Sequence, residues 1–195
     1  MDTLAKLFGS VARMKVLRLV LFNRDTRFSV QKVAYRARIQ KKTARKELEL
    51  LAAIGLLKKQ KAKIDGKAGV LYKLNQSFEH FNALRSFIRQ TTEIKKSDVI
   101  GAFKGCGTIK LLVLSGTLTD TSQSSIDILI VGDRLQQKKL DQAMRRLEAE
   151  LGQELSYASF STEDFRYRLG VYDRLLRDVL EYHNHALIDK INATQ

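Results

Sequence analysis

The sequence predicts an α+β chain of two domains, in which three helices and a β-hairpin precede a small α/β domain. Three observations support this prediction. Apolar residues recur at helical spacing as far as about residue 54, and at strand spacing from there to residue 74. After residue 97, short apolar runs alternate with helical stretches. The charge is also divided, because residues 1–75 hold 19 Lys/Arg against 5 Asp/Glu, while residues 76–195 hold 16 of each. This asymmetry indicates a polyanionic partner for the first part only.

The composition narrows the class of protein. A chain of 195 residues with 44% hydrophobic and 29% charged residues is globular, and no apolar run approaches the roughly 20 residues that span a bilayer. The start MDTLAKLFGS shows no secretory pattern. Cys106 is the single cysteine, which excludes an internal disulfide and a cysteine-based zinc cluster. We therefore expect a cytoplasmic protein that needs no membrane, no metal and no cofactor.

Helical periodicity and turn signals place the elements of the first domain, residues 1–76. Ser29 is a suitable N-cap for the second helix, and Gly55 stands where a helix needs a left-handed C′ residue. Asp65-Gly66, inside a six-residue loop, is a hairpin signal. A helix in the connecting segment 77–96 would pack on this domain, join the two domains or form a dimer contact. The predicted elements are helices at 3–22, 30–37 and 41–54, strands at 56–63 and 70–74, and the connecting helix at 77–90.

The second domain, residues 97–195, is predicted to contain a sheet of three or more strands with helices on at least one face. The segment Ser161-Thr162-Glu163-Asp164 is typical of a capping box, so the end of the chain is expected to be helical. The predicted elements are a helix at 97–104, a strand at 108–114, a polar loop at 117–124, a strand at 126–131, a helix at 135–151, a strand at 154–160, and helical residues from 162 to 182 and on to 191.

One segment of the first domain resembles a known DNA-reading helix. Residues 42–57, KTARKELELLAAIGLL, are similar to the recognition helix of ArsR- and MarR-type regulators: a Thr near the start, then Leu, Leu three residues on, and Gly-Leu leading into the hairpin. Residues 7–17 are similar to the first helix of the same family. The resemblance implies a winged helix-turn-helix over residues 4–75 that reads double-stranded DNA, and a homodimer, because such regulators pair on two half-sites.

The helical phase predicts which residues of this domain face the DNA. Ala44, Leu48, Leu51 and Ile54 face the core, which leaves the basic side of the third helix open. Lys and Arg contact guanine in the major groove and Thr contacts the thymine methyl, whereas phosphate contacts position the protein without specifying sequence. The candidates on the third helix are Lys41, Lys42, Thr43, Arg45 and Lys46, and the candidates for phosphates are Lys32, Arg36, Lys61, Lys63 and Lys67.

The second domain resembles the nucleotidyltransferase superfamily at residues 111–116 and 124–133. Members of that family carry Gly-Ser after a strand, and Asp-x-Asp on the next strand to hold Mg²⁺. Here the dipeptide is inverted as Ser115-Gly116, the first Asp position is Ser125, and only Asp127 remains. These four residues form a possible vestigial nucleotide site. No catalytic residue and no metal ligand are expected, and Asp127 fits better as a strand-end acid satisfied by hydrogen bonds.

Other groups of residues leave alternatives open. His183 and His185 are two apart, so in a predicted helix they would not share a face, and no metal site is expected there. The apolar side chains of the last helix would form either core or a dimer seam, and these are Leu169, Tyr172, Leu176, Val179 and Leu180.

These observations favour a DNA-binding transcriptional regulator whose second domain is non-catalytic and serves for sensing, dimerisation or partner binding. One alternative is an active nucleotidyltransferase that the basic domain directs to its target. Another is an antitoxin-like module whose second domain binds only a protein. A nucleotide or a protein is therefore a possible partner of the second domain.

Overall fold

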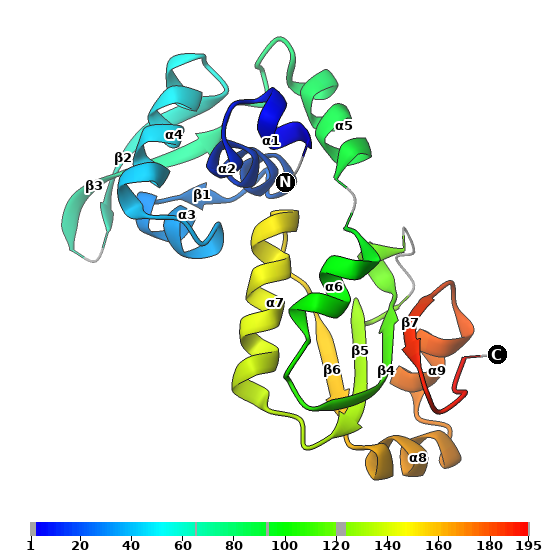
Figure 1. The fold of residues 1–195 in the computed structure, drawn as a ribbon. Coiled ribbons are helices and arrows are strands. Elements are labelled where there is room, and N and C mark those ends of the chain that lie inside the picture. Colours follow the sequence, from blue (N-terminus) through cyan, green and yellow to red (C-terminus); the bar gives the residue numbers. More distant parts are fainter. Residues whose placement is uncertain (1–2, 65, 93, 120–123, 195) are drawn as a thin grey trace. The chain divides into compact units, whose positions relative to one another are not determined.

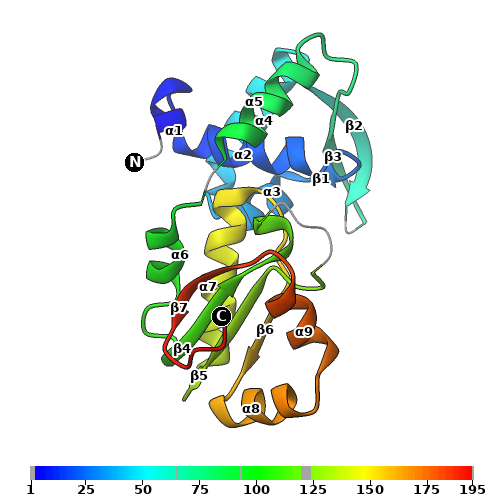
Figure 2. The same ribbon diagram turned by 90° about the vertical axis from the view of Figure 1, so that its right-hand side faces the viewer.

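The computed structural model describes residues 3–64, 66–92, 94–119 and 124–194. Within these residues it shows a mixed α+β fold with nine α-helices and two β-sheets. The chain divides into two compact units (Figures 1 and 2). The first unit contains residues 1–94 and 145–153, and the second contains 95–144 and 154–195.

The first unit consists of helices followed by an antiparallel hairpin that one short strand completes. The strands pair in the order β1-β3-β2, with β1 and β2 both antiparallel to β3. Its elements are α1 (Thr3–Leu7), α2 (Val11–Phe22), β1 (Arg27–Phe28), α3 (Val30–Arg36), α4 (Lys41–Ala53), β2 (Leu57–Ile64), β3 (Lys67–Leu74) and α5 (Phe81–Thr91).

Local sequence explains where the helices of the first unit begin and end. Ser10 and Ser29 cap α2 and α3, because their side chains accept from the backbone N–H groups three residues on. Gly55 follows α4 with a φ of +82°, as a C′ residue requires. The predicted core side of α4 is confirmed for Ala44, Leu48 and Leu51, which are buried, but it is wrong for Ile54, which is 54% exposed because it lies beyond the last turn as the C-cap. Because this side of α4 is buried in the core, the opposite side of the helix stays exposed.

Three details of the first unit differ from the sequence prediction. Arg27 and Phe28 form β1, because they pair with Lys73 and Tyr72, whereas none of the elements predicted from the sequence covers these two residues. The prediction of a six-residue hairpin loop is wrong, because β2 and β3 pair as far as Ile64 and Lys67. The connecting helix is α5, and it packs on this unit, because its Phe81 and Ile88 belong to the same buried core cluster as α2 and α4.

The second unit is a four-stranded sheet between helices. Its strands lie in the order β6-β5-β4-β7, in which only the β5–β6 pair is parallel. Its elements are α6 (Lys96–Ala102), β4 (Thr108–Leu114), a 3₁₀ turn (Gly116–Leu118), β5 (Ile128–Asp133), α7 (Gln137–Leu151, shared with the first unit), β6 (Tyr157–Phe160), α8 (Thr162–Gly170), α9 (Arg174–Glu181) and β7 (His185–Asp189).

Alternating side chains give the sheet two buried faces. Leu111 and Val113 of β4 pack with Phe165 of α8 and with Leu176 of α9. Their strand neighbours, including Leu112, are also fully buried. They face the other side of the sheet, where α6 and α7 lie (Figure 2). The sequence therefore predicted the strand–helix alternation, but it left open that helices cover both faces.

The end of the chain corrects the sequence prediction. His185–Asp189 is not helical but forms β7, which pairs antiparallel with β4. Leu176 and Val179 are buried and form core, whereas Leu169 and Tyr172 are exposed. Of these four side chains, only the two exposed ones therefore remain candidates for a dimer seam. A search of the described residues for a helix long and apolar enough to cross a membrane found none.

Candidate functional site

The first turns of α4 present exposed basic side chains, and the first turn holds no acid to offset them. Lys41, Lys42, Arg45 and Lys46 are exposed and Thr43 is half-buried. The first turn of α4 contains no acidic residue, and its N-cap, Gln40, makes no side-chain capping bond. None of these four cations forms an ion pair with another residue in the described part of the chain. Their charge is therefore available to an external anion.

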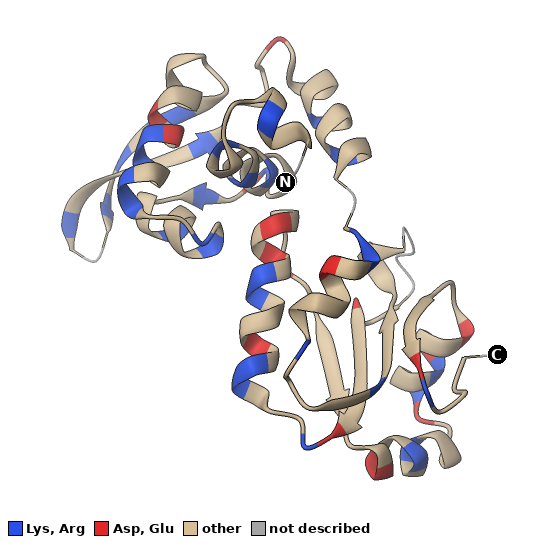
Figure 3. Cartoon of the chain, in the orientation of Figure 1, with Lys and Arg blue, Asp and Glu red and all other residues tan. Residues whose placement is uncertain are grey.

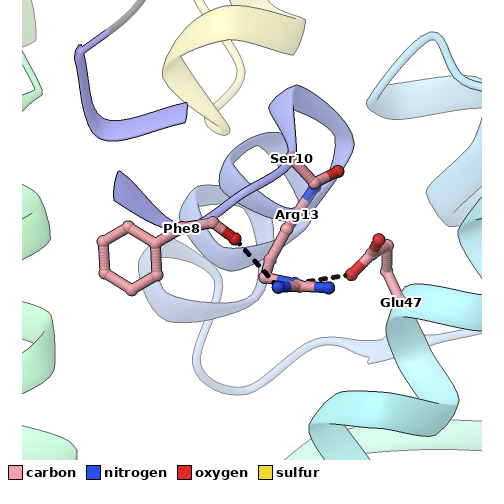
Figure 4. A network of polar contacts seen from close by, with 4 residues as sticks. All are labelled: Phe8, Ser10, Arg13 and Glu47. Carbon is pink, nitrogen blue, oxygen red and sulfur yellow. Dashed lines mark hydrogen bonds and ion pairs between the residues drawn. The ribbon is translucent and has the colours of Figure 1, made fainter. Parts of the chain in front are cut away.

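The first acid of α4, Glu47, is used inside the unit. Its side chain is buried, and its Oε2 lies 2.9 Å from Nε of Arg13 on α2 (Figure 4). Nη1 of Arg13 also donates to the backbone oxygen of Phe8, at 2.8 Å. Removing one partner of a buried pair leaves an uncompensated charge, so the pair holds α4 against α2.

The second acid of α4, Glu49, connects the helix to the hairpin. Its carboxylate accepts from Nζ of Lys59 on β2 and from Oη of Tyr72 on β3, the latter at 2.5 Å. The hydrogen bonds from Lys59 and Tyr72 lower the pKa of Glu49. Burial, and then the hydrogen bond to Glu49, raise the pKa of Tyr72 to about 12. Both acids of α4 thus accept from other residues of the unit, although Glu49 stays exposed and its charge also interacts with that of Arg45.

Two adjoining depressions border the open side of α4. One, of about 680 Å³, includes Tyr35 of α3 and Lys41 in its lining, and the other, of about 440 Å³, includes Arg45 and Val70. They share Ser29, Gln31 and Ile64. The concave surface therefore runs from α3 past α4 to the hairpin.

Sequence reasoning did not select several residues of this surface. Tyr35 is 64% exposed and lines the larger depression, together with Gln31 and Ile64. Its position among Lys32, Arg36 and Arg38 was a usable signal, because an exposed aromatic among cations is common at nucleic-acid interfaces.

The structure brings some of the phosphate candidates together and separates others. Lys32 of α3 is exposed and lines the larger depression, and Arg36 is half-buried and donates to Oδ1 of Asn23. Lys61 and Lys63 pair with Val70 and Ala68 in the β2–β3 register. Lys67 pairs with Ile64, so it points to the opposite face of the hairpin. The three hairpin lysines therefore do not form one cluster.

In the second unit, Asp127 is held entirely by hydrogen bonds within the protein. Only 7% of the residue is exposed. Its Oδ1 accepts from the backbone N–H of Thr117 at 2.9 Å and from the hydroxyl of Thr117 at 2.6 Å. Its Oδ2 accepts from the backbone N–H of Ser156 at 2.8 Å and from the hydroxyl of Ser156 at 2.9 Å. The Asp127 carboxylate is therefore satisfied by hydrogen bonds, as we expected from the sequence, but the sequence did not identify Thr117 and Ser156 as the donors.

The other residues of the possible nucleotide site surround Asp127 but offer few polar groups. Ser115 is buried, and its hydroxyl donates to the backbone oxygen of Ile126 at 2.7 Å. Gly116 has a φ of +56°, and a Cβ there would lie 2.8 Å from Oδ1 of Asp127. Ser125 is exposed. The cluster thus resembles a packed turn more than an open metal site, and part of the predicted loop, 120–123, lies outside the described residues.

The two histidines near the C-terminus correct one step of the sequence argument. His185 begins β7 and His183 lies in the bend before it, so neither is in a helix, and their ring centroids lie 5.0 Å apart. Among the described residues, no group of three or more His, Cys, Asp or Glu side chains is placed to hold a metal ion.

The comparisons with known proteins add no relative. No protein-family model matches the chain, and neither a curated protein nor a solved structure matches it.

Proposed function

We propose that this chain is a transcriptional regulator that binds double-stranded DNA through its first unit, which acts as a winged helix-turn-helix. The supporting observation is the set of four exposed, unpaired cations on the first turns of α4, beside a concave surface that continues to the hairpin. The helix order and the β1-β3-β2 sheet are compatible with this assignment.

In this proposal α4 enters the major groove. Lys42, Arg45 and Lys46 contact base edges there, with Lys41 and Thr43 beside them. Lys32 and Arg36 on α3, and Lys61 and Lys63 on β2, contact phosphates and set the orientation. The Glu47–Arg13 and Glu49–Tyr72 contacts keep α4 fixed while its exposed cations bind.

We propose that the second unit is a nucleotidyltransferase-like domain without catalytic activity, which serves for sensing, dimerisation or partner binding. The support is Asp127, the one carboxylate left of the Asp-x-Asp motif. Each of its two oxygens already accepts two hydrogen bonds from protein groups, which leaves a poor ligand for Mg²⁺.

The decisive experiment is a selection of genomic DNA fragments at physiological salt with the full chain and with an Arg45→Ala/Lys46→Ala variant. We expect the unmodified protein to enrich a defined sequence and the variant to lose that enrichment. A Lys138→Ala/Lys139→Ala variant is the matched control, because these are also adjacent, exposed cations on a helix. Equal enrichment by all three proteins would exclude α4 as the reading helix.

A further inference from the structure

Three basic side chains form a row across the sheet of the first unit. Arg27 of β1 pairs with Lys73 of β3, and Lys58 of β2 pairs with the same Lys73 from the other side. Residues directly opposite on neighbouring strands point to the same face of a sheet. The three cations therefore lie side by side, at the strand spacing of about 5 Å.

This row faces away from α4. The next row of the same sheet, Phe28–Tyr72–Lys59, points to the opposite face. Phe28 and Tyr72 are buried in the core. Tyr72 and Lys59 both contact Glu49 of α4. The row of Arg27, Lys58 and Lys73 is thus separate from the surface that we propose for base reading.

The arrangement is unfavourable within the fold. Arg27 and Lys58 are exposed and Lys73 is half-buried. None of them forms an ion pair with another residue that the structure describes, although the exposed Asp25 lies two residues before Arg27. Like charges directly opposite each other destabilise a sheet. The row costs stability without an internal contact that offsets it, which points to an external anion.

We infer that Arg27, Lys58 and Lys73 form a second DNA-backbone contact, which holds a second duplex segment on the face of the sheet opposite α4. This inference rests on the proposed function and extends it from reading one duplex to bridging two. The row spans about 10 Å, which equals about three intervals between successive phosphates of one strand at about 3.4 Å of axial rise each.

The neighbouring residues favour duplex DNA as the ligand. The next pair on the same face is Gln60 and Leu71, so no aromatic side chain stands beside the cations in the paired part of β2 and β3. Proteins that bind single strands stack bases on aromatic side chains, whereas phosphate contacts alone suit a duplex backbone.

The test is a bridging assay with the full chain. A biotinylated duplex that contains the selected sequence is immobilised, and capture of a second, fluorescent duplex is measured. The variant Arg27→Gln/Lys58→Gln/Lys73→Gln is compared with Lys42→Gln/Arg45→Gln/Lys46→Gln, which removes an equal charge from α4. We expect the first variant to keep its affinity for one duplex within about threefold and to lose at least tenfold of the bridging. The second variant should lose most of its affinity for the selected duplex.

The outcomes separate this inference from the proposed function. Bridging by the sheet variant at the unmodified level would overturn the inference and leave the proposed function intact, because a dimer reading through two copies of α4 would explain it. Unchanged single-duplex binding by the α4 variant, with loss of that binding in the sheet variant, would overturn both the proposed reading helix and the inference of a second contact, because the sheet row would then hold the first duplex. Absence of any DNA binding in the unmodified protein would overturn both.

Thermal unfolding shows whether the sheet variant folds. Because the substitutions remove three adjacent like charges, we expect its Tm to equal or exceed that of the unmodified protein. Lower bridging together with a higher Tm would support a binding role. Lower bridging with a Tm several degrees lower would overturn it, since the row would then stabilise the fold.

Discussion

The two units treat their charged groups in opposite ways. In the first, the acids of α4 are occupied by Arg13, Lys59 and Tyr72, while the cations of the same helix stay unpaired. In the second, acidic and basic residues are mixed along the chain (Figure 3) and balance in number, and carboxylates such as those of Asp127 and Asp133 accept from neighbouring groups. Asp133, for example, accepts from Lys110 and Thr162, and these bonds lower its pKa to about 2. The contrast teaches that net charge matters less than which charges the fold itself leaves free.

The largest expected effect concerns salt. If the first unit supplies the DNA contacts, a protein that neutralises six to ten phosphates loses about 10³–10⁵-fold in affinity between 50 and 200 mM salt. Lys61→Gln/Lys63→Gln should then lower the slope of log K against log salt by about 1.8. Fluorescence anisotropy titrations at several salt concentrations measure both quantities.

The matched control is Lys138→Gln/Lys139→Gln in the second unit, which should leave the slope unchanged. An equal change of slope from the second-unit lysines would remove the contrast between the units, because both would then contact DNA.

The sequence predicted most of the regular elements because each has a local signal. The buried face of α4 follows from the spacing of Ala44, Leu48 and Leu51. By contrast, β1 has only two residues, too few to show a period, and it exists through its pairing with β3. The helical prediction for 185–189 was wrong because no Gly or Pro separates β7 from α9, and because the partner strand β4 lies about 75 residues earlier.

The candidate site was predictable to a similar degree. The exposed cations of α4 follow from helical phase alone. Tyr35 was missed because its exposure depends on how α3 packs. The hydrogen bonds from Thr117 and Ser156 to Asp127 join residues 10 and 29 positions apart, a distance over which a single sequence carries no pairing signal.

The next effect tests the tight packing of the second unit. Gly132→Ala should lower its free energy of unfolding by about 3 kcal/mol, because a Cβ at Gly132 would lie 2.3 Å from the backbone oxygen of Thr108. Gly170→Ala is the matched control. Nothing lies within 4 Å of a Cβ there, and alanine suits a helix better by roughly 0.5–1 kcal/mol. Chemical denaturation measures both variants, and equal stabilities would mean that the β4–β5 pair relaxes freely.

A smaller effect tests whether the Asp127 carboxylate is structural. Asp127→Asn replaces one acceptor oxygen by an amino group that would face two donors, so we expect a loss of about 2 kcal/mol in unfolding free energy. Glu181→Gln, at an exposed ion pair with Arg177, should change stability by less than about 0.5 kcal/mol.

Mg²⁺ with ATP should not raise the Tm of the unmodified protein. A rise in Tm that Asp127→Asn abolishes would reveal a nucleotide site and break the proposed contrast.

The smallest effect compares one tyrosine in each unit. Tyr72 donates to Glu49, and Tyr157 donates to Asp141. Burial, and then the hydrogen bond to the carboxylate, raise each pKa to about 12. A raised pKa means that the stabilisation is fully present below the ordinary pKa near 10 and is lost as the pH rises from 10 to 12. Spectrophotometric titration should therefore show that Tyr72→Phe and Tyr157→Phe each remove one late-ionising tyrosine. Each substitution should lower the free energy of unfolding by about 1 kcal/mol at neutral pH.

Since the Tyr72 hydrogen bond joins α4 to the hairpin, only Tyr72→Phe should also weaken DNA binding. An equal loss of binding from Tyr157→Phe would show that the second unit takes part in binding.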